Sequence, residues 1–503
     1  MQRKQRLLKN TFSSLILQIV TIICGLILPR MILAFYSSDV NGLVNSISRF
    51  LSLITFLEFG ICSVIQSALY KPLAYKDNDE VSKIVVSASR FFRKVASALL
   101  IYVIVLIATY PFLVIKEFDY LYTASLIMAM SISYFAQYYF GLVDQLFLTA
   151  DQKGYIYYSS QTLVVILNTI ACVVMIKIGV GIQMFKLISS LIYLLRPLFL
   201  RYYVNRNYSI NRKIQYTKEP IKQKWNGLAQ QISAIVLGDT DVIVLTLFST
   251  LANVSIYSVY NLVVTGVKQV LISMTNGFHS LLGELWAKQE GAKLNQTFAF
   301  FEWIVHTGVV FTFGCTATLI LSFVSIYTEG VTDADYIVPT FAVLITIAHA
   351  SHCLRLPYNI MIMAGNHYKQ TQWNHITAAV INLAISIATV KIFGLVGVAI
   401  GTLVAMLYQT IWMAIYISKN LIRWPLRNFI KQCLCDICTC IIVIPVLRLI
   451  DLSASGYYYW ALLAIRVAVI WGLAVVIVNL ICFRSNLKEI VTRIRFRFSN
   501  RGV

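Results

Sequence analysis

Apolar runs of about 20 residues recur along the chain at intervals of roughly 30–35 residues, with short polar segments between them. An α-helix of that length crosses the hydrocarbon core of a bilayer. Alternation with a period of two, which a membrane β-barrel requires, is absent from the sequence. The pattern predicts an all-α polytopic membrane protein. Its fourteen expected transmembrane helices lie at about 11–36, 41–69, 93–115, 120–142, 156–176, 181–203, 225–250, 254–282, 298–324, 336–363, 373–391, 395–418, 432–450 and 457–483.

Basic residues gather on one side of the expected spans. Of 42 Lys and Arg residues, 31 fall in alternate segments on one side, four in the opposite loops and seven inside spans. Because Lys and Arg are enriched in cytoplasmic loops, both termini are expected in the cytoplasm. This distribution accounts for the net charge of +21, so the charge is no reason to expect a nucleic-acid partner. The first apolar run is too long for a signal peptide and is expected to remain as a helix.

The composition supports a membrane location and no metal site. Mean hydropathy is +0.74 and 13% of residues are charged, against about 25% in soluble domains. The ten cysteines lie in or near apolar runs, where they act as small apolar residues. The spacing C-x-C-x-x-C-x-C at 433–440 falls in an expected helix, where four thiols cannot converge on one ion.

A weak internal repeat appears when the sequence is aligned with itself so that Ala150 falls on Ala364. At nearly this shift FYSSDVN (35–41) falls on LFSTLAN (247–253), FLTADQKGY (147–155) falls on MIMAGNHYK (361–369), and Asn168 falls on Asn382. Six helices form the unit, and an even number gives both copies the same orientation, as in parallel repeats. The expected regions are a six-helix lobe (1–203), a basic cytoplasmic linker (204–224) lying on the anionic leaflet, a second lobe (225–424), two additional helices (425–483) and a basic tail (484–503).

Seven cations lie inside expected spans, where a charge costs roughly 2.5–3.5 kcal/mol unless it faces a wet cavity. Arg30 and Arg49 fall in the first two helices, and Lys268 falls in the second-copy counterpart of the second. In a two-lobed protein these three can face one central cavity and bind an anion, phosphate in particular. The alternative is local pairing with acids such as Glu58. Arg196 and Arg466 are expected to snorkel towards water, and Lys186 is ambiguous.

Acidic residues inside spans are candidates for ion coupling. Glu58, Asp239 and Asp241 could bind a proton or cation, or could be structural partners of cavity cations. Because Asp239 and Asp241 are two residues apart, only one can face a cavity squarely on a regular helix. Their D-x-D spacing resembles that of metal-dependent glycosyltransferases, but it lies in an apolar run.

A polar group stands in the string HASHCLRLPYN. His349, His352 and Arg355 are spaced one helical turn apart, so they form either a stripe facing a cavity or satisfied packing. A metal interpretation lacks a third ligand. Pro29 and Pro357 are expected to kink their helices. Gly394, Gly397 and Gly401 are expected to allow close helix packing.

Several strings resemble the polysaccharide branch of the multidrug/oligosaccharidyl-lipid/polysaccharide exporter superfamily, the Wzx-type O-antigen and capsule flippases. They are LPRMILAFYSSDVNGLVNSISRFLSLITFLEFGI, QSALYKPLA and FLTADQKGY. The resemblance implies a V-shaped transporter of the bacterial inner membrane that works by alternating access. It would flip an undecaprenyl-diphosphate-linked oligosaccharide for capsule or lipopolysaccharide synthesis, without a cofactor, coupled to an H⁺ or Na⁺ gradient or the membrane potential, alone or with the pathway's polymerase and glycosyltransferases.

The resemblance also implies roles for particular residues. Related lipid II flippases use arginines in helices 1, 2 and 8, the helices that hold Arg30, Arg49 and Lys268 here. Arg355 is a further candidate for substrate binding. An organic-cation exporter of the same fold is the alternative, for which an acidic cavity would be expected. A polymerase or ligase of lipid-linked glycans is disfavoured because no large external loop is expected, so the chain is predicted not to be an enzyme.

Overall fold

The computed structural model describes residues 2–216, 219–221, 238, 240–422 and 424–484, and its described elements are helical. The contacts divide the chain into two compact units, Met1–Ser255 and Ile256–Val503. The prediction of an all-α chain is confirmed. Asp239 and the tail from residue 485 lie outside the described residues, as does most of the expected span 225–250.

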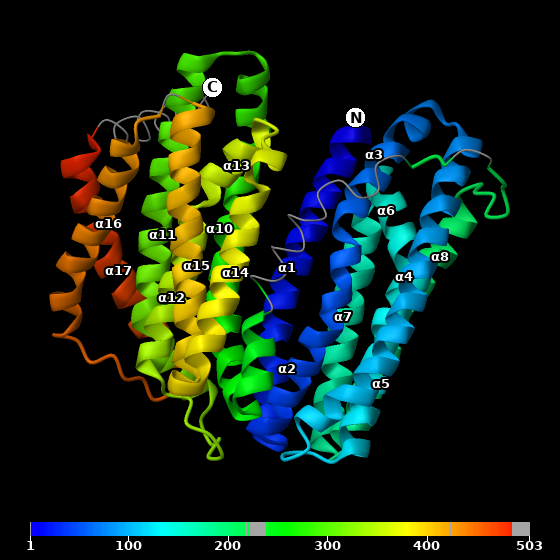
Figure 1. Ribbon diagram of the computed structural model, residues 1–503, viewed down its shortest axis with the longest axis horizontal. Helices are drawn as coiled ribbons and strands as arrows, with labels where there is room; N and C mark the ends of the chain where they lie inside the picture. Colours follow the sequence, from blue (N-terminus) through cyan, green and yellow to red (C-terminus); the bar gives the residue numbers. More distant parts are fainter. Residues whose placement is uncertain (1, 217–218, 222–237, 239, 423, 485–503) are drawn as a thin grey trace. The chain divides into compact units, whose positions relative to one another are not determined.

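The first unit is a bundle of long helices, of which α4, α5, α7 and α8 run alongside one another in Figure 1. Helix α1 packs along α7, and α5 packs along α8. The elements are α1 (Gln2–Phe35), α2 (Ser38–Ser52), the 3₁₀ segment η1 (Leu53–Leu57), α3 (Phe59–Tyr75), α4 (Asn78–Leu113), α5 (Tyr120–Ala136), the π-helical segment η2 (Gln137–Gly141), α6 (Leu142–Ala150), α7 (Gly154–Lys177) and α8 (Ile182–Asn207). Residues 240–248 form a further helical segment.

The second unit begins within α10, whose first residues belong to the first unit. Helix α14 packs along α15, and α11 packs against both α12 and α17. The elements are α10 (Leu251–Ala287), α11 (Gly291–Tyr327), α12 (Pro339–Leu354), α13 (Leu356–Ala364), α14 (Tyr368–Phe393), α15 (Leu395–Asn420), α16 (Leu426–Leu447) and α17 (Tyr457–Cys482).

Ten helices among the described residues are long and apolar enough to cross a membrane, which makes the chain a multi-pass membrane protein. Four of the fourteen expected spans are not among them: 41–69, 225–250, 254–282 and 336–363. Two of these four are interrupted. The span 41–69 is divided by η1, and 336–363 changes helix at Arg355. The change at Arg355 stands two residues before Pro357, where a kink was expected. The interruption of 41–69 was not expected, because apolar content alone does not reveal a local change in the backbone hydrogen bonding.

Helix boundaries recur at the shift found in the sequence. Helix α6 ends at Ala150 and α13 at Ala364, while α7 begins at Gly154 and α14 at Tyr368, so one shift relates both pairs. Among the described residues, four non-glycine residues have positive φ, and to within a single position the same shift relates Lys76 to Gln289 and Gln152 to Asn366. Left-handed residues of this kind are uncommon, so their recurrence reflects similar loop geometry in the two halves.

The described part of the basic linker packs on the first unit. Arg212 pairs with Asp144 of α6 at 2.7 Å, and the Asp144 side chain is fully buried. The backbone N–H of Asn211 donates to the Ser82 hydroxyl of α4 at 3.0 Å. The linker's polar groups are therefore used in intramolecular contacts.

The glycines before and within α15 allow the close approach of α14. A Cβ on Gly397 would lie 2.6 Å from the carbonyl oxygen of Thr389, and one on Gly401 would lie 2.3 Å from the Ser386 hydroxyl. Gly394 begins the connection with φ +54°, a conformation that favours glycine. The expectation of close packing is confirmed for Gly397 and Gly401, whereas Gly394 serves the backbone turn.

We expect Gly397→Ala to destabilise the protein by about 1–3 kcal/mol, because a backbone carbonyl must move to make room. Thermal unfolding in detergent measures the loss. Gly266→Ala is the matched control, since a Cβ at that helical position meets no atom within 4 Å. Equal midpoints for the two variants would contradict the prediction.

Candidate functional site

The predicted cations of the first unit lie near helix ends and irregularities. Arg30 follows Pro29 in α1, and Arg49 lies in the last turn of α2, just before η1; both side chains are half-buried. Glu58 lies between η1 and α3, where its carboxylate accepts a hydrogen bond from the Tyr138 hydroxyl of η2. Arg49 and Glu58 therefore flank the interruption rather than sharing one regular helix.

Asp241 is buried, with 2% of its surface exposed, in the helical segment 240–248 of the first unit. The same segment contacts α2, because the hydroxyls of Thr246 and Ser46 lie 2.7 Å apart. Tyr110 of α4 donates to Ser46 at 2.6 Å. Asp241 is thus a buried acid on a segment whose Thr246 makes a polar contact with α2, whereas Asp239 lies outside the described residues.

The second unit brings Lys268 and the three residues of the polar stripe together. Arg355 is buried and lies where α12 gives way to α13, with its Nη2 2.9 Å from His352 Nδ1. Lys268 of α10 lies close enough to His349 and His352 for its charge to act on both. Such a group of basic side chains suits an anion better than a cation.

One polar pair recurs in the two units at corresponding positions. In the first unit, Arg196 Nη1 of α8 donates to Gln161 Oε1 of α7 at 2.6 Å. In the second unit, Gln409 Nε2 of α15 lies 2.9 Å from His375 Nδ1 of α14. The shift that relates the helix boundaries also relates these pairs, to within a single position. Arg196 is 9% exposed, so the expectation that it snorkels to water was wrong; two glutamines provide its partners inside the unit.

A buried carboxylate network in the second unit was not expected. Glu302 of α11 is fully buried and accepts hydrogen bonds from Tyr358 at 2.5 Å and from Trp424 at 3.0 Å. One turn along α11, His306 Nδ1 lies 2.6 Å from the carboxylate of Asp436 in α16. The spacing of Glu302 and His306 was the available signal, but it does not reveal which residues of other helices meet them.

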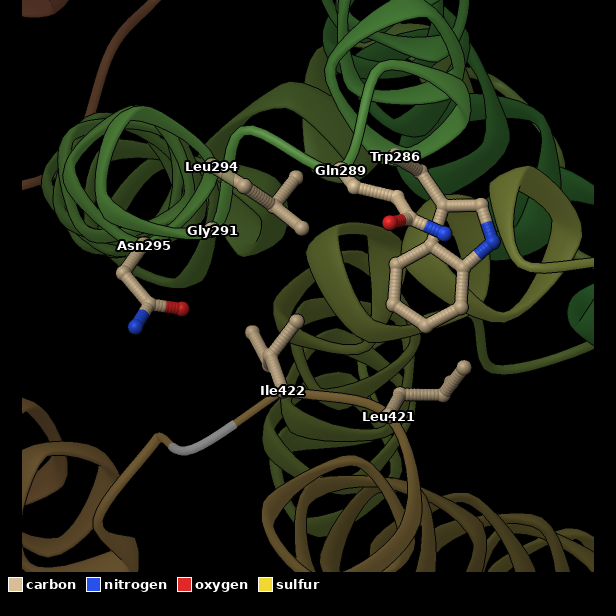
Figure 2. A pocket seen from close by; sticks show the side chains of 7 residues that line it. All are labelled: Trp286, Gln289, Gly291, Leu294, Asn295, Leu421 and Ile422. Carbon is tan, nitrogen blue, oxygen red and sulfur yellow. The ribbon is translucent and has the colours of Figure 1, made fainter.

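A cavity of about 530 Å³ lies in the second unit near the α10–α11 connection. Figure 2 shows its lining side chains, which come from the end of α10 and the following turn, from the start of α11, and from the residues after α15: Trp286, Gln289, Gly291, Leu294, Asn295, Leu421 and Ile422. None of these seven is charged. An anion would find no counter-charge there, so this cavity is not the predicted substrate site.

Comparison with solved structures identifies the fold. The chain is similar to a structure of the lipid II flippase MurJ in an inward closed conformation (TM-score 0.66, 15% identity), over 95% of this chain and 99% of that one. It is also similar to an inward-facing MATE-family multidrug resistance transporter (TM-score 0.64, 13% identity, 79% and 94% coverage). A mutant of the Vibrio cholerae MATE transporter VcmN gives a TM-score of 0.57 at 11% identity, with 83% and 98% coverage.

The sequence comparisons add no closer relationship. No protein-family model matches the chain, and no curated protein sequence matches it significantly. The likeness therefore rests on tertiary structure and covers nearly the whole chain. It shows that this multi-pass membrane protein has the fold seen in the structures of MurJ and of the MATE-family transporter.

Proposed function

We propose that this protein is a flippase of lipid-linked oligosaccharides. It moves an undecaprenyl-diphosphate-linked glycan from the cytoplasmic to the outer leaflet of the bacterial inner membrane for surface polysaccharide synthesis, as Wzx-type flippases do. Two parallel six-helix repeats alternate access to the substrate, and both termini lie in the cytoplasm. The protein acts as a transporter and not as an enzyme.

The observation that carries the proposal is the basic group of Lys268, His349, His352 and Arg355 in the second unit. It is enclosed in a fold whose solved members include a flippase of lipid II. A lipid diphosphate offers several anionic oxygens, and charge-assisted hydrogen bonds to Arg and Lys are about twice as strong as neutral ones. Desolvated cations inside a membrane protein are costly, which favours a role for them in binding.

Arg30 and Arg49 of the first unit complete the proposed set of diphosphate-binding residues, with Lys268 and Arg355 of the second. Arg can bind a phosphate in a bidentate manner, whereas Lys acts as a point charge. In the proposed cycle the basic residues of both units bind the diphosphate in turn, while the glycan follows through the polar interior. The recurring helix boundaries and left-handed residues support the parallel duplication on which this cycle depends.

Coupling to an ion gradient is assigned to the acids of the first unit. Asp241 is buried, and Glu58 accepts a hydrogen bond from the Tyr138 hydroxyl of η2. A buried carboxylate next to a helix interruption can gain or lose a proton when the interruption changes its geometry. Asp239, the third acid of the proposal, lies outside the described residues.

A second candidate function is the export of organic cations. It is favoured by the likeness to MATE multidrug transporters and by the buried carboxylate of Glu302 with its aromatic neighbours. Carboxylates and aromatic faces are the groups that bind organic cations. The basic group around Lys268 disfavours such a substrate in the second unit.

Reconstitution distinguishes the two functions. We expect wild-type protein in liposomes to move a fluorescent undecaprenyl-diphosphate oligosaccharide between leaflets, measured as the fraction accessible to an impermeant quencher. The same vesicles are tested for uptake of ethidium under an imposed proton or sodium gradient. Empty liposomes give the uncatalysed rate.

Lipid flipping well above the empty-vesicle rate, without ethidium transport, supports the flippase. Ethidium transport without lipid flipping under any gradient would establish the second candidate instead. Dependence of the flipping rate on one ion gradient would identify the coupling ion, and Asp241→Asn should remove that dependence if Asp241 is the coupling acid.

A further inference from the structure

The first unit contains a polar groove between α5, α7 and α8, with a cavity volume of about 340 Å³. Ligand pockets range from about 300 to 1,000 Å³, so the groove can enclose a small polar group. Nine of its eleven lining residues are polar or charged, two of them are cations, and none is a carboxylate. The lining itself therefore carries positive charge and is rich in hydroxyl and amide groups, while the Glu58 carboxylate outside the lining lies close enough to act on Arg196.

One face of α8 forms the longest wall of the groove. Its residues follow helical periodicity: Lys186, Ser189, Ser190, Tyr193, Arg196 and Pro197. Lys186 and Arg196 are ten residues apart, which places them about 15 Å apart along the helix axis. The serines and Tyr193 lie between the two charges. A ligand along this wall would meet a cation at each end and hydroxyl groups in the middle.

Helices α5 and α7 supply the opposite wall. Ser133 and Tyr134 of α5 share a face with Gln137, the first residue of the π-helical segment η2. Gln161 of α7 faces the same groove. Single π-helical turns inside α-helices occur frequently at functional sites, and this one presents Gln137 to the Arg196 side chain, whose Nη2 donates to it at 3.2 Å.

The two cations keep hydrogen-bonding capacity for a ligand. Arg196 bonds to Gln161 and Gln137 and also lies against Tyr157. Its Nε is buried without a hydrogen-bond partner, so the five N–H donors of the guanidinium are not all used. The ammonium of Lys186 lies 5.3 Å from the centroid of the Phe185 ring. No hydrogen bond or ion pair joins Lys186 to any residue within the described ranges. Three N–H donors of Lys186 are thus available to an anion.

We propose that this groove binds a saccharide unit that carries an anionic group, a carboxylate or a phosphate ester. Either Lys186 or Arg196, each at its own end of the groove, binds the anionic group, the amides and serines bind sugar hydroxyls, and the tyrosines pack on the sugar ring. The proposal rests on the proposed function and deepens it, because it assigns the glycan part of the substrate to a site separate from the cations proposed for the diphosphate. It implies selectivity for acidic glycans.

Equilibrium binding to the purified full-length protein in detergent tests the groove without requiring transport. Isothermal titration uses three probes: tri-galacturonate, maltotriose as the neutral sugar, and inorganic phosphate. Lys186→Gln is the main variant, because Lys186 holds no described neighbour in place. Arg196→Gln is the second variant, and Lys177→Gln, at an exposed lysine at the end of α7, is the matched control.

We expect tri-galacturonate to bind, maltotriose to bind at least tenfold more weakly, and Lys186→Gln to raise the Kd for tri-galacturonate about tenfold or more. Lys177→Gln should bind like wild type. Absence of tri-galacturonate binding, or an equal Kd for the Lys186 and Lys177 variants, would overturn the proposal. Phosphate binding as tight as that of tri-galacturonate would reduce the groove to an anion site without sugar recognition. The flipping assay in liposomes tests the proposed function separately, so failure of the groove proposal does not decide whether the protein is a flippase.

Discussion

Replacing Arg30, Arg49 and Lys268 together by glutamine is expected to lower the initial rate of lipid-linked oligosaccharide flipping about a hundredfold or more. Each lost charge-assisted hydrogen bond to the diphosphate costs roughly 1.5–3 kcal/mol, so even strongly non-additive losses exceed two powers of ten. The residues come from both units, and the proposed cycle needs both sets of cations. The quencher assay in liposomes measures the rate at equal protein content.

A matched triple variant separates the loss of site cations from the loss of net charge. Lys116→Gln, Lys177→Gln and Lys391→Gln remove the same charge from exposed lysines, and this variant should flip at the wild-type rate. Lys268→Arg keeps the charge and adds a bidentate donor, so it should retain most activity. Wild-type flipping by the Arg30/Arg49/Lys268 triple variant would exclude these three residues from substrate binding while leaving the transporter fold unaffected.

Arg212→Ala is expected to destabilise the first unit by about 3–5 kcal/mol, the usual cost of breaking a buried ion pair from one side. The Asp144 carboxylate has no exposed surface and its second oxygen is also buried without a hydrogen-bond partner. Loss of the guanidinium would leave an uncompensated charge inside the bundle. For a unit of this length, Met1–Ser255, this corresponds to a fall in the thermal midpoint of roughly 6 °C or more, measured by unfolding in detergent.

The double-mutant cycle identifies the ion pair as the cause. Lys213→Ala, at the exposed neighbouring residue, should leave the midpoint unchanged. Adding Asp144→Asn to Arg212→Ala should recover most of the loss, because the buried charge is removed with its partner. If the double variant is as unstable as Arg212→Ala alone, the linker stabilises the unit through contacts other than this pair.

Hydrophobic run length was sufficient to establish the class of the protein. Runs of about 20 apolar residues have one stable form in lipid, the helix, because every backbone polar group must be satisfied within the segment. The polar interruption near residue 36 likewise marked the end of α1, and Ser37 caps α2 there by accepting from the Val40 N–H. Weak matches in the sequence predicted an internal repeat, and the helix ends at Ala150 and Ala364 follow the same shift.

The 3₁₀ and π-helical interruptions inside apolar runs could not be predicted from the sequence. Leu53–Leu57 and Gln137–Gly141 are as apolar or as aromatic as their neighbours, so hydropathy treats them as regular helix. Their 3₁₀ and π conformations change which residues share a face. That change decides that Glu58 meets Tyr138 and that Gln137 meets Arg196.

The sequence by itself determined which charged residues lie within the expected spans. The cost of a charge in lipid then implied that these side chains face the protein interior or water. Only the tertiary structure decided their partners, because the partners lie on different elements: Arg196 of α8 meets Gln161 of α7, and Glu302 of α11 meets Trp424, which follows α15. Periodicity fixes the face of a single helix, whereas the pairing of two faces depends on crossing angle and packing. For that reason Arg196, expected to snorkel towards water, lies instead in a polar groove, and the pairing of Arg212 with the buried carboxylate of Asp144 was not predicted.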